Sequence, residues 1–460
     1  MQYKIHSRTF KIEDQFDFAC FSGDFNPIHV DPIYSRRTMI GECIVHGVHG
    51  FLYALNSLLE FNGCTVNCFE IKFIKPIPLN VLVSCVLVDE DEMQIVGDAN
   101  NIYTTIKFSI DTKLLRDDLQ TMNTTERLPK PLNMTLDECS TFTASDWAYS
   151  GNSIVGENLF PKLFQAYGHS AIVELIGTSE VVGMRCPGLK SLFLSLKGKF
   201  SNKDYLPTYR VLECDKRFGI LSLIFEGRRL EAEAKVLYLR SQLSNLSISK
   251  ISQIVTRDEF KDVNALVIGG SRGLGEIVAK LIAYGGGRVV ITYDKGEDDA
   301  QKVQQEVTEW GGKCRTLQLS VTENFSIPKD NFNQIYYFAS SKIKKEDRDF
   351  IDQILLDKYD LFYVNGFRNL LNQILKNDLK SNVFYPSTIF LNGNSNGYWA
   401  YTEAKARGEQ ICREFNDKNL LRALYSRLPR LATDQNLGLI QDEFPEAVDI
   451  LYPIILKMAV

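Results

Sequence analysis

The segment from Phe21 to His29, which reads FSGDFNPIH, brings an acid, an amide and an imidazole close together in the chain. A glycine and a proline interrupt it, so we expect a shaped loop rather than a regular helix. Hydration of a double bond needs a base that takes a proton from water and an acid that protonates carbon. Asp24 and His29 can supply both functions, with Asn26 between them.

A glycine-rich segment, IVHGVHG from Ile44 to Gly50, precedes an apolar run and predicts the start of a buried helix. A thioester enolate needs amide donors, and Gly47 at this helix start can offer one. We expect His46 and His49 to begin the helix or to pack in the core, not to catalyse. The alternative reading of the preceding loop is that its acid and amide cap a turn and its histidine is a core residue.

Together these segments resemble the MaoC-like, (R)-specific enoyl hydratase family, matched here as SGDFNPIH followed by IVHG over about the first 110 residues. The resemblance implies a hotdog fold, in which a sheet wraps a long helix. It also implies catalysis by Asp24 and His29, support from Asn26, and an oxyanion side lined by Gly47. The sequence departs from the family at Leu55, where relatives often carry a serine.

The pattern of an apolar helix followed by strands recurs after a polar stretch at about residues 111–140. In this second half Asn152 stands in the place of the acid and Glu157 in the place of the histidine. An amide cannot act as a base, so we expect the second copy to be non-catalytic and to shape the acyl tunnel. The predicted domains are a catalytic hotdog at 1–120 and a second hotdog at 121–245.

From residue 262 to residue 460, strands alternate with helices, which predicts a parallel sheet. The segment GGSRGLG, from Gly269 to Gly275, lies between the first strand and the first helix. Glycine there permits close approach of the backbone to a pyrophosphate at the helix N-terminus.

Four further residues follow in the order Asn365, Ser387, Tyr401 and Lys405. This order, after the glycine-rich segment, resembles the short-chain dehydrogenase/reductase family over about residues 262–435. The resemblance implies that Tyr401 donates a proton to a carbonyl and that Lys405 lowers the pKa of this tyrosine and binds ribose. It further implies that Ser387 holds the carbonyl oxygen and that Asn365 orders a water relay. The residues implied to bind the cofactor are Gly269, Ser271, Arg272, Gly273, Leu274, Gly275, Asp294, Ala339, Tyr401, Lys405, Pro429 and Thr433.

Two departures from that family concern the cofactor site. The segment from Tyr337 to Ser340, YFAS, stands where relatives carry Asn-Asn-Ala-Gly, and Ser320 replaces a common aspartate. Arg272 and Lys295 can neutralise a 2′-phosphate, whereas Asp294 can bind the ribose hydroxyls of NAD. We expect NADP(H) rather than NAD(H).

The composition is that of an ordinary globular protein, with 45% apolar and 24% charged residues. A net charge of -5 leaves no basic surface for nucleic acid. The first residues do not read as a signal peptide, and no apolar run is long enough for a membrane span. Ten cysteines lie singly, without metal-ligand spacing. We therefore expect a cytoplasmic protein with no metal and no membrane or nucleic-acid partner.

The predicted architecture is an α+β double hotdog followed by an α/β Rossmann-type doubly wound parallel sheet. The pairing suggests reduction of a 3-oxoacyl thioester to the (R)-3-hydroxyacyl thioester, and its reversible dehydration to the trans-2-enoyl thioester. We expect the acyl group to be carried by CoA or an acyl carrier protein, and a homo-oligomer to form through the reductase domain. Two alternatives are a hydratase with an altered, nucleotide-sensing Rossmann part, and a non-catalytic scaffold that binds an acyl carrier.

Overall fold

The computed structural model describes residues 3–98, 101–110, 130–203, 206–239, 246–346, 351–393, 397–431 and 444–459. The chain divides into two compact units, Met1–Ser241 and Gln242–Val460. Both predicted hotdog domains therefore contribute to the first unit. Their predicted boundary at 120/121 and most of the predicted linker lie outside the described residues.

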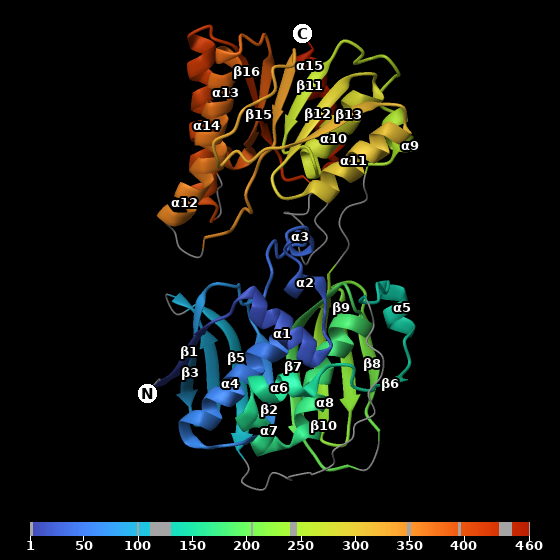
Figure 1. Cartoon of the computed structure of the whole chain (residues 1–460), viewed down its shortest axis with the longest axis vertical. Helices are drawn as coiled ribbons and strands as arrows, with labels where there is room; N and C mark the ends of the chain where they lie inside the picture. The colour runs from blue at the N-terminus through green and yellow to red at the C-terminus, as the bar shows by residue number, and fades with distance from the viewer. Residues whose placement is uncertain are drawn as a thin grey trace. The chain divides into compact units, whose positions relative to one another are not determined.

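The first unit is built on one antiparallel sheet of ten strands, in the order β1-β3-β4-β5-β2-β7-β10-β9-β8-β6 (Figure 1). The strands of its first half are β1 (Tyr3–Thr9), β2 (Val66–Phe73), β3 (Leu82–Asp89), β4 (Glu92–Val96) and β5 (Ile102–Ile110). Those of its second half are β6 (Ser145–Asp146), β7 (Ser191–Phe200), β8 (Thr208–Asp215), β9 (Ile220–Glu226) and β10 (Leu230–Tyr238). The halves join where β2 pairs with β7, so neither half has a sheet of its own.

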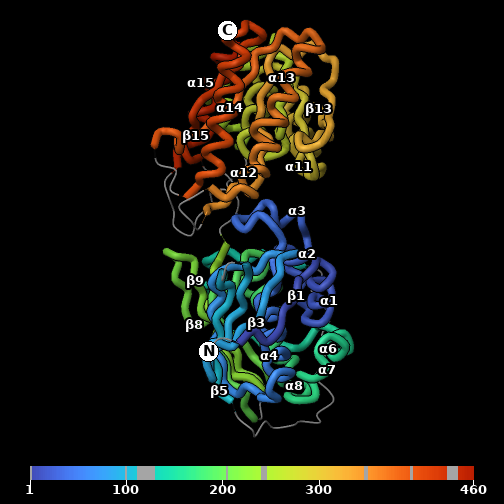
Figure 2. Tube along the Cα trace, turned by 90° about the vertical axis from the view of Figure 1, so that its left-hand side faces the viewer, coloured from blue at the N-terminus to red at the C-terminus, as the bar shows by residue number. Residues whose placement is uncertain are grey.

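Helices α1, α4, α6 and α8 of this unit lie on one side of the sheet (Figure 2). In the first half the helices are α1 (Ile12–Ser22), α2 (Pro27–Val30), α3 (Pro32–Ser35) and α4 (Gly47–Asn62). In the second half they are α5 (Leu136–Thr141), α6 (Ser153–Leu159), α7 (Pro161–Tyr167), α8 (His169–Glu180) and the π-helix η2 (Val181–Arg185). The apolar helices α4 and α8 pack against each other, which confirms the predicted double hotdog.

One predicted helix of the second half is wrong in detail. The sequence pattern predicts a single helix over 161–179, but the structure divides it into α7 and α8. Gly168, between them, has a φ of 81° and a ψ of 164°, which is not a helical conformation.

The duplicated segments pack directly on each other. The Tyr149 hydroxyl donates a hydrogen bond to the main-chain oxygen of Phe21 at 2.5 Å. A Cβ on Gly151 would overlap the same oxygen, and one on Gly156 would overlap the Phe21 ring. The two copies therefore interlock through positions that tolerate no side chain.

The second unit holds a six-stranded sheet in the order β13-β12-β11-β14-β15-β16, and each of its strand pairs is parallel. The strands are β11 (Asn264–Ile268), β12 (Arg288–Tyr293), β13 (Lys313–Gln318), β14 (Gln334–Tyr337), β15 (Asn382–Thr388) and β16 (Arg422–Leu428). The strand order reverses between β11 and β14, and ligands of such sheets bind at the carboxyl ends of the strands beside that point.

Helices cover both faces of this sheet through two separate apolar cores, which confirms the predicted doubly wound fold. One face carries α9 (Ile248–Ser252), α10 (Gly273–Tyr284), α11 (Glu297–Glu309) and α15 (Ala447–Met458). The other carries α12 (Gln353–Asp360), the π-helix η3 (Leu361–Gly366), α13 (Phe367–Lys376) and α14 (Trp399–Asp417). The 3-10 turn η4 (Ile389–Asn392) follows β15.

Within the described parts of the chain, no helix is both long enough and apolar enough to cross a membrane.

We predict opposite effects of Gly→Ala substitutions in the two central helices. At Gly50 in α4 a Cβ would meet the Ile77 side chain at 3.4 Å, an ordinary contact, so Gly50→Ala should stabilise the helix by about 0.5–1 kcal/mol. At Gly177 in α8 a Cβ would overlap the Trp147 ring, so Gly177→Ala should destabilise by about 1–3 kcal/mol. Urea unfolding measures both, and a Gly177→Ala protein as stable as Gly50→Ala would contradict the packing described.

Candidate active sites

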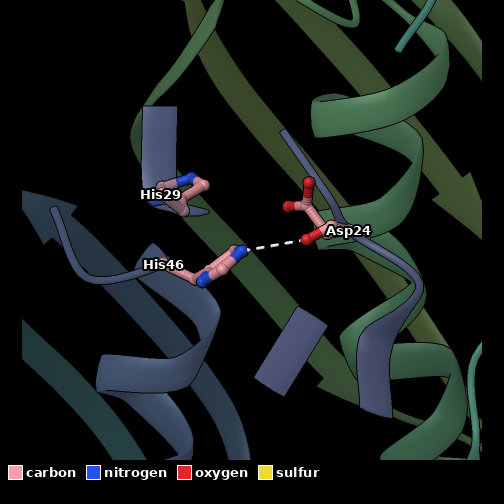
Figure 3. A group of neighbouring side chains, drawn as sticks. All are labelled: Asp24, His29 and His46. Carbon is pink, nitrogen blue, oxygen red and sulfur yellow. Dashed lines mark hydrogen bonds between the residues drawn. The ribbon is translucent and has the colours of Figure 1, made fainter. Parts of the chain in front are cut away.

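The first candidate site begins where helix α1 ends. Gly23 terminates α1 with a φ of 81°, a left-handed conformation that favours glycine. Asn26 then caps the short helix α2, because its side-chain oxygen accepts the main-chain N–H of Ile28 at 3.1 Å. Pro27 occupies the first turn of α2, where its missing N–H costs nothing. This local geometry turns Asp24 and His29 toward each other (Figure 3).

The structure brings the predicted acid and base together. Ligand-type atoms of Asp24, His29 and His46 all lie within 4.8 Å of one another. This separation is short enough for proton transfer between the acid and the base, either directly or through a water molecule.

Asp24 is a buried carboxyl, with 2% of its surface exposed. Ser179 donates a hydrogen bond to its Oδ2 at 2.7 Å, and the main-chain N–H of Asn26 donates to its Oδ1 at 3.1 Å. Burial raises the pKa of Asp24 to about 7, although both hydrogen bonds favour the ionised form, and the neighbouring Glu180 adds to the increase. This carboxyl can exchange a proton near neutral pH.

His29 is held as a neutral imidazole. Its Nδ1 lies 2.9 Å from the main-chain oxygen of Ile44, which can only accept, so Nδ1 carries the proton and Nε2 keeps a lone pair. Burial lowers the pKa of His29 to about 4. At neutral pH this ring is a base.

Asn26 and Gly47 complete the predicted constellation. The side-chain amide of Asn26 donates to the main-chain oxygens of Gly183 at 3.0 Å and Gly188 at 3.1 Å, which ties the loop to the second half. Gly47 is the first residue of α4, and the first N–H groups of a helix have no partner within it. The Phe73 ring would lie 3.0 Å from a Cβ at Gly47.

Two residues of the second half belong to this site and were not identified from the sequence. A serine does contact Asp24, but it is Ser179 of α8, whereas Leu55, the position expected from spacing, is a core residue with 2% exposure. A Cβ on Gly183 of η2 would overlap the Asp24 carboxyl. Spacing within the first repeat carries no signal for either residue.

The second half does not repeat the acid and base. Asn152 caps α6 by accepting the main-chain N–H of Ile154 at 3.1 Å, and it is exposed. Glu157 is exposed as well. This placement is consistent with the expectation that the second copy has no catalytic pair.

Asp24, His29 and His46 are also residue types that bind transition metals. However, the rings of His29 and His46 stack with centroids 3.8 Å apart and 24° between their planes. Both ring nitrogens of His46 also face protein oxygens at 3.0 Å, the side-chain oxygen of Gln15 and the main-chain oxygen of Asp24. The geometry therefore favours proton transfer over metal binding.

The second candidate site starts at the glycine-rich loop between β11 and α10. Gly269 has a φ of 76°, and a Cβ there would lie 2.8 Å from the main-chain nitrogen of Ala339. A Cβ on Gly275 would overlap the main-chain oxygen of Gly269. Gly273 has a φ of 59° and open space around its missing side chain. Such a cradle at a helix N-terminus fits a pyrophosphate.

The remaining predicted cofactor residues surround this loop or the neighbouring strand ends. Ser271, Arg272 and Leu274 are half-buried within the loop itself. Asp294, like the adjacent Lys295, is exposed directly after β12. Pro429 follows β16 and is half-buried, whereas Thr433 lies outside the described residues.

Tyr401 lies on α14 between two other tyrosines. Its ring meets those of Tyr359 and Tyr363 edge to face, with centroids 6.0 and 5.6 Å away. Burial raises the pKa of Tyr401, and a hydrogen bond with Thr388 offsets only part of this effect. Lys405 is not among the groups that shift the pKa of Tyr401 here, so its role in lowering that pKa stays a prediction.

Lys405 is enclosed by aromatic rings. Its Nζ donates a hydrogen bond to the main-chain oxygen of Pro386 at 2.7 Å. The same atom lies 4.1 Å from the ring centroid of Tyr363 and 4.8 Å from that of Tyr385. Burial lowers the pKa of Lys405 to about 7. The lysine is thus buried among tyrosines and bonded to the main chain.

Ser387 and Asn365 have surroundings that the sequence did not indicate, and their predicted roles stay predictions. The Ser387 hydroxyl donates to Glu409 at 2.6 Å, and Glu409 lies on α14, the helix that also carries Tyr401. Thr388, the next residue, is the one that contacts Tyr401. Asn365 is exposed on η3, where the wider helical turn changes which residues face inward, and Tyr363 lies at the site instead.

Comparison with known proteins finds a matching family for each of the two parts of the chain. Residues 2–109 match the family described as MaoC like domain, and residues 263–335 match the family described as short chain dehydrogenase. The short-chain dehydrogenase/reductase FrzI of Cladobotryum sp is 40% identical over 86 residues, which cover 19% of this chain and 31% of FrzI. The 1-cyclohexenylcarbonyl-CoA reductase of Streptomyces collinus is 44% identical over 57 residues, 12% of this chain and 20% of that protein. The chain thus spans less than a third of the length of these curated relatives.

Among solved structures, FolM alternative dihydrofolate reductase 1 from Brucella canis, complexed with NADP, aligns with a TM-score of 0.36 and 14% identity. The alignment covers 44% of this chain and 90% of that one.

We predict that Ser179→Ala raises the pKa of Asp24 further above about 7. The hydroxyl stabilises the ionised carboxylate, so its removal favours the protonated form. A carboxyl ¹³C NMR titration measures this pKa. Thr178→Val is the matched control, because the Thr178 hydroxyl donates to the main-chain oxygen of Leu175 on the same helix. An equal or lower pKa in Ser179→Ala would contradict the assigned contact.

Proposed function

Since this chain joins a MaoC-like domain to a short-chain dehydrogenase domain, we propose that it performs two successive reactions on one acyl thioester. The second unit reduces a 3-oxoacyl thioester to the (R)-3-hydroxyacyl thioester, and the first unit interconverts that product with the trans-2-enoyl thioester. The observation that carries this proposal is the pair of buried Asp24 and half-buried His29, whose polar side-chain atoms lie within 4.8 Å of each other.

The hydration step follows from the protonation states of this pair. Neutral His29 takes a proton from water as the water oxygen bonds to the β carbon. Asp24, whose pKa burial raises to about 7, donates its proton to the α carbon. The proton on His29 then returns to Asp24, which restores the pair, and dehydration runs through the same steps in reverse. The N–H of Gly47 meets the negative charge that develops on the thioester oxygen.

In the reductase unit a nicotinamide nucleotide, when bound, would supply the hydride. The glycine cradle at Gly269, Gly273 and Gly275 would hold its pyrophosphate, and Lys405 would approach its ribose. Tyr401 donates a proton to the substrate carbonyl oxygen, and the Thr388 hydroxyl holds that oxygen in the role first expected of Ser387.

We propose NADP(H) as the cofactor rather than NAD(H). The support is the position of Lys295 and Asp294 directly after β12, together with Arg272 in the loop, which gives two cations and one carboxylate near the expected ribose. The charges favour a 2′-phosphate.

We propose CoA or an acyl carrier protein as the carrier of the acyl group, and the cytoplasm as the location of the protein. A homo-oligomer through the reductase unit is supported by apolar side chains on α12 and η3. Ile354 is 84% exposed and Leu361 is 44% exposed. Burial of such residues between two subunits is favourable.

A second candidate function is a hydratase whose Rossmann unit senses a nucleotide without reducing a substrate. The observation that favours it is the enclosure of Lys405, whose Nζ is bonded to the main chain and covered by tyrosine rings. Separate assays of hydration and of reduction distinguish this function from the bifunctional one.

We predict that the two activities are separable by single substitutions. With crotonyl thioester, Asp24→Asn should lower hydration about 10²- to 10⁴-fold, because the amide cannot exchange a proton. With acetoacetyl thioester and NADPH, Tyr401→Phe should abolish the absorbance change. Each variant is the control for the other and should keep the activity of the other unit. Wild-type hydration without any reduction would support the second candidate function.

We predict that Thr388→Val lowers the reductase kcat about 10²-fold, because Tyr401 and the substrate lose a hydroxyl partner. Ser387→Ala is the matched control at the neighbouring residue, whose hydroxyl donates to Glu409 instead. Glu409, which loses the Ser387 hydrogen bond, keeps its bonds from Arg427, so reduction should stay close to wild type. The reverse ranking in steady-state kinetics would restore Ser387 as the functional hydroxyl.

A further inference from the structure

We infer that His46 is a positioning residue of the dehydratase site, which holds Asp24 and His29 in place relative to the amide of Gly47. The inference rests on the proposed hydration reaction. The sequence by itself predicts only a residue that begins the helix or packs in the core.

Two contacts join His46 to the acid and the base (Figure 3). Its Nε2 lies 3.0 Å from the main-chain oxygen of Asp24, which is the dashed line in the figure. Its ring stacks on that of His29 with centroids 3.8 Å apart. The first contact fixes the main chain that carries the carboxyl, and the second fixes the orientation of the imidazole.

A third contact joins His46 to helix α1. Gln15 of α1 is fully buried, and its side-chain oxygen accepts the main-chain N–H of His46 at 3.0 Å. The same oxygen lies 3.0 Å from Nδ1 of His46. A neutral ring donates one hydrogen bond, either to Asp24 from Nε2 or to Gln15 from Nδ1. The ring therefore lies between two oxygens that restrict its rotation.

His46 also directly precedes Gly47, so the same residue connects the proton-transfer pair to the start of α4. A displacement of the pair relative to the helix requires the Asp24 contact, the stack or the Gln15 anchor to break. Misplacement of reacting groups by about 1 Å can cost about 10²-fold in rate. A rigid connection of this kind is what a reaction with an acid, a base and an oxyanion donor needs.

The stacked ring also keeps water from one face of His29. Burial is the main cause of the lowered pKa of His29, about 4, so loss of the covering ring should raise that pKa. The titratable groups around His29 are Asp24 in the loop, His46 and His49 on the α4 side, and Glu180 on α8 beyond Asp24.

Two substitutions in the full-length protein separate the contacts. His46→Phe keeps a ring over His29 but removes both hydrogen-bonding nitrogens. His46→Gln keeps a donor but removes the ring. We expect each to lower kcat for crotonyl thioester hydration by about 10- to 10²-fold with little change in KM, because His46 does not touch the substrate. We expect the acid limb of the pH profile to move upward, toward pH 6.5, in His46→Gln and to stay in place in His46→Phe.

His169→Phe is the control, because it removes another imidazole of the first unit, at the start of α8, whose ring packs on Phe164. It should leave kcat and the acid limb close to wild type. Thermal unfolding shows whether each variant is folded. If both His46 variants fail to fold, Gln15→Leu removes the anchor behind the intact ring, and a kcat loss is expected there too.

Folded His46 variants with wild-type kcat and an unchanged acid limb would overturn the inference and leave the proposed function standing. Where Gln15→Leu has to replace them, a wild-type kcat in that variant would have the same meaning. A wild-type protein that does not hydrate crotonyl thioester would instead overturn the proposed function.

Discussion

A carboxyl group placed in a dry interior must be hydrogen-bonded or protonated, and in the first unit this requirement falls on Asp24. Its hydrogen-bond partners come from both halves: the main-chain N–H of Asn26 from its own loop and the hydroxyl of Ser179 from α8. Asn26 in turn is held by main-chain oxygens of Gly183 and Gly188. The site therefore exists only while the two halves share one sheet.

This requirement explains why the second repeat can lose its own acid and still be needed. Asn152 is only a helix cap. However, α8 of the same repeat supplies Ser179, which hydrogen-bonds to Asp24, and η2 supplies Gly183, whose missing side chain leaves room for the Asp24 carboxyl. A larger residue at position 183 would displace the carboxyl. The second copy is thus a structural part of the first site.

Burial shifts the pKa of one acid and one base toward neutral pH, one in each unit. It raises the pKa of Asp24 to about 7 and lowers the pKa of Lys405 to about 7. The surroundings of the two groups differ, because Asp24 is surrounded by hydrogen-bond donors and Lys405 by the rings of Tyr363 and Tyr385. In each case the protein interior, more than a neighbouring charge, sets the protonation state.

The sequence by itself determined features that depend on neighbours in the chain. The turn that brings Asp24 toward His29 and the glycine cradle of the second unit follow from local backbone geometry, and residue spacing carries that information. The contact of Ser179 with Asp24, the different partners of Ser387 and Thr388, and the exposure of Asn365 were decided only by the tertiary structure. The first depends on contact between repeats, the second on the packing of α14 against the end of β15, and the third on a π-helix. None of these leaves a spacing pattern in the chain.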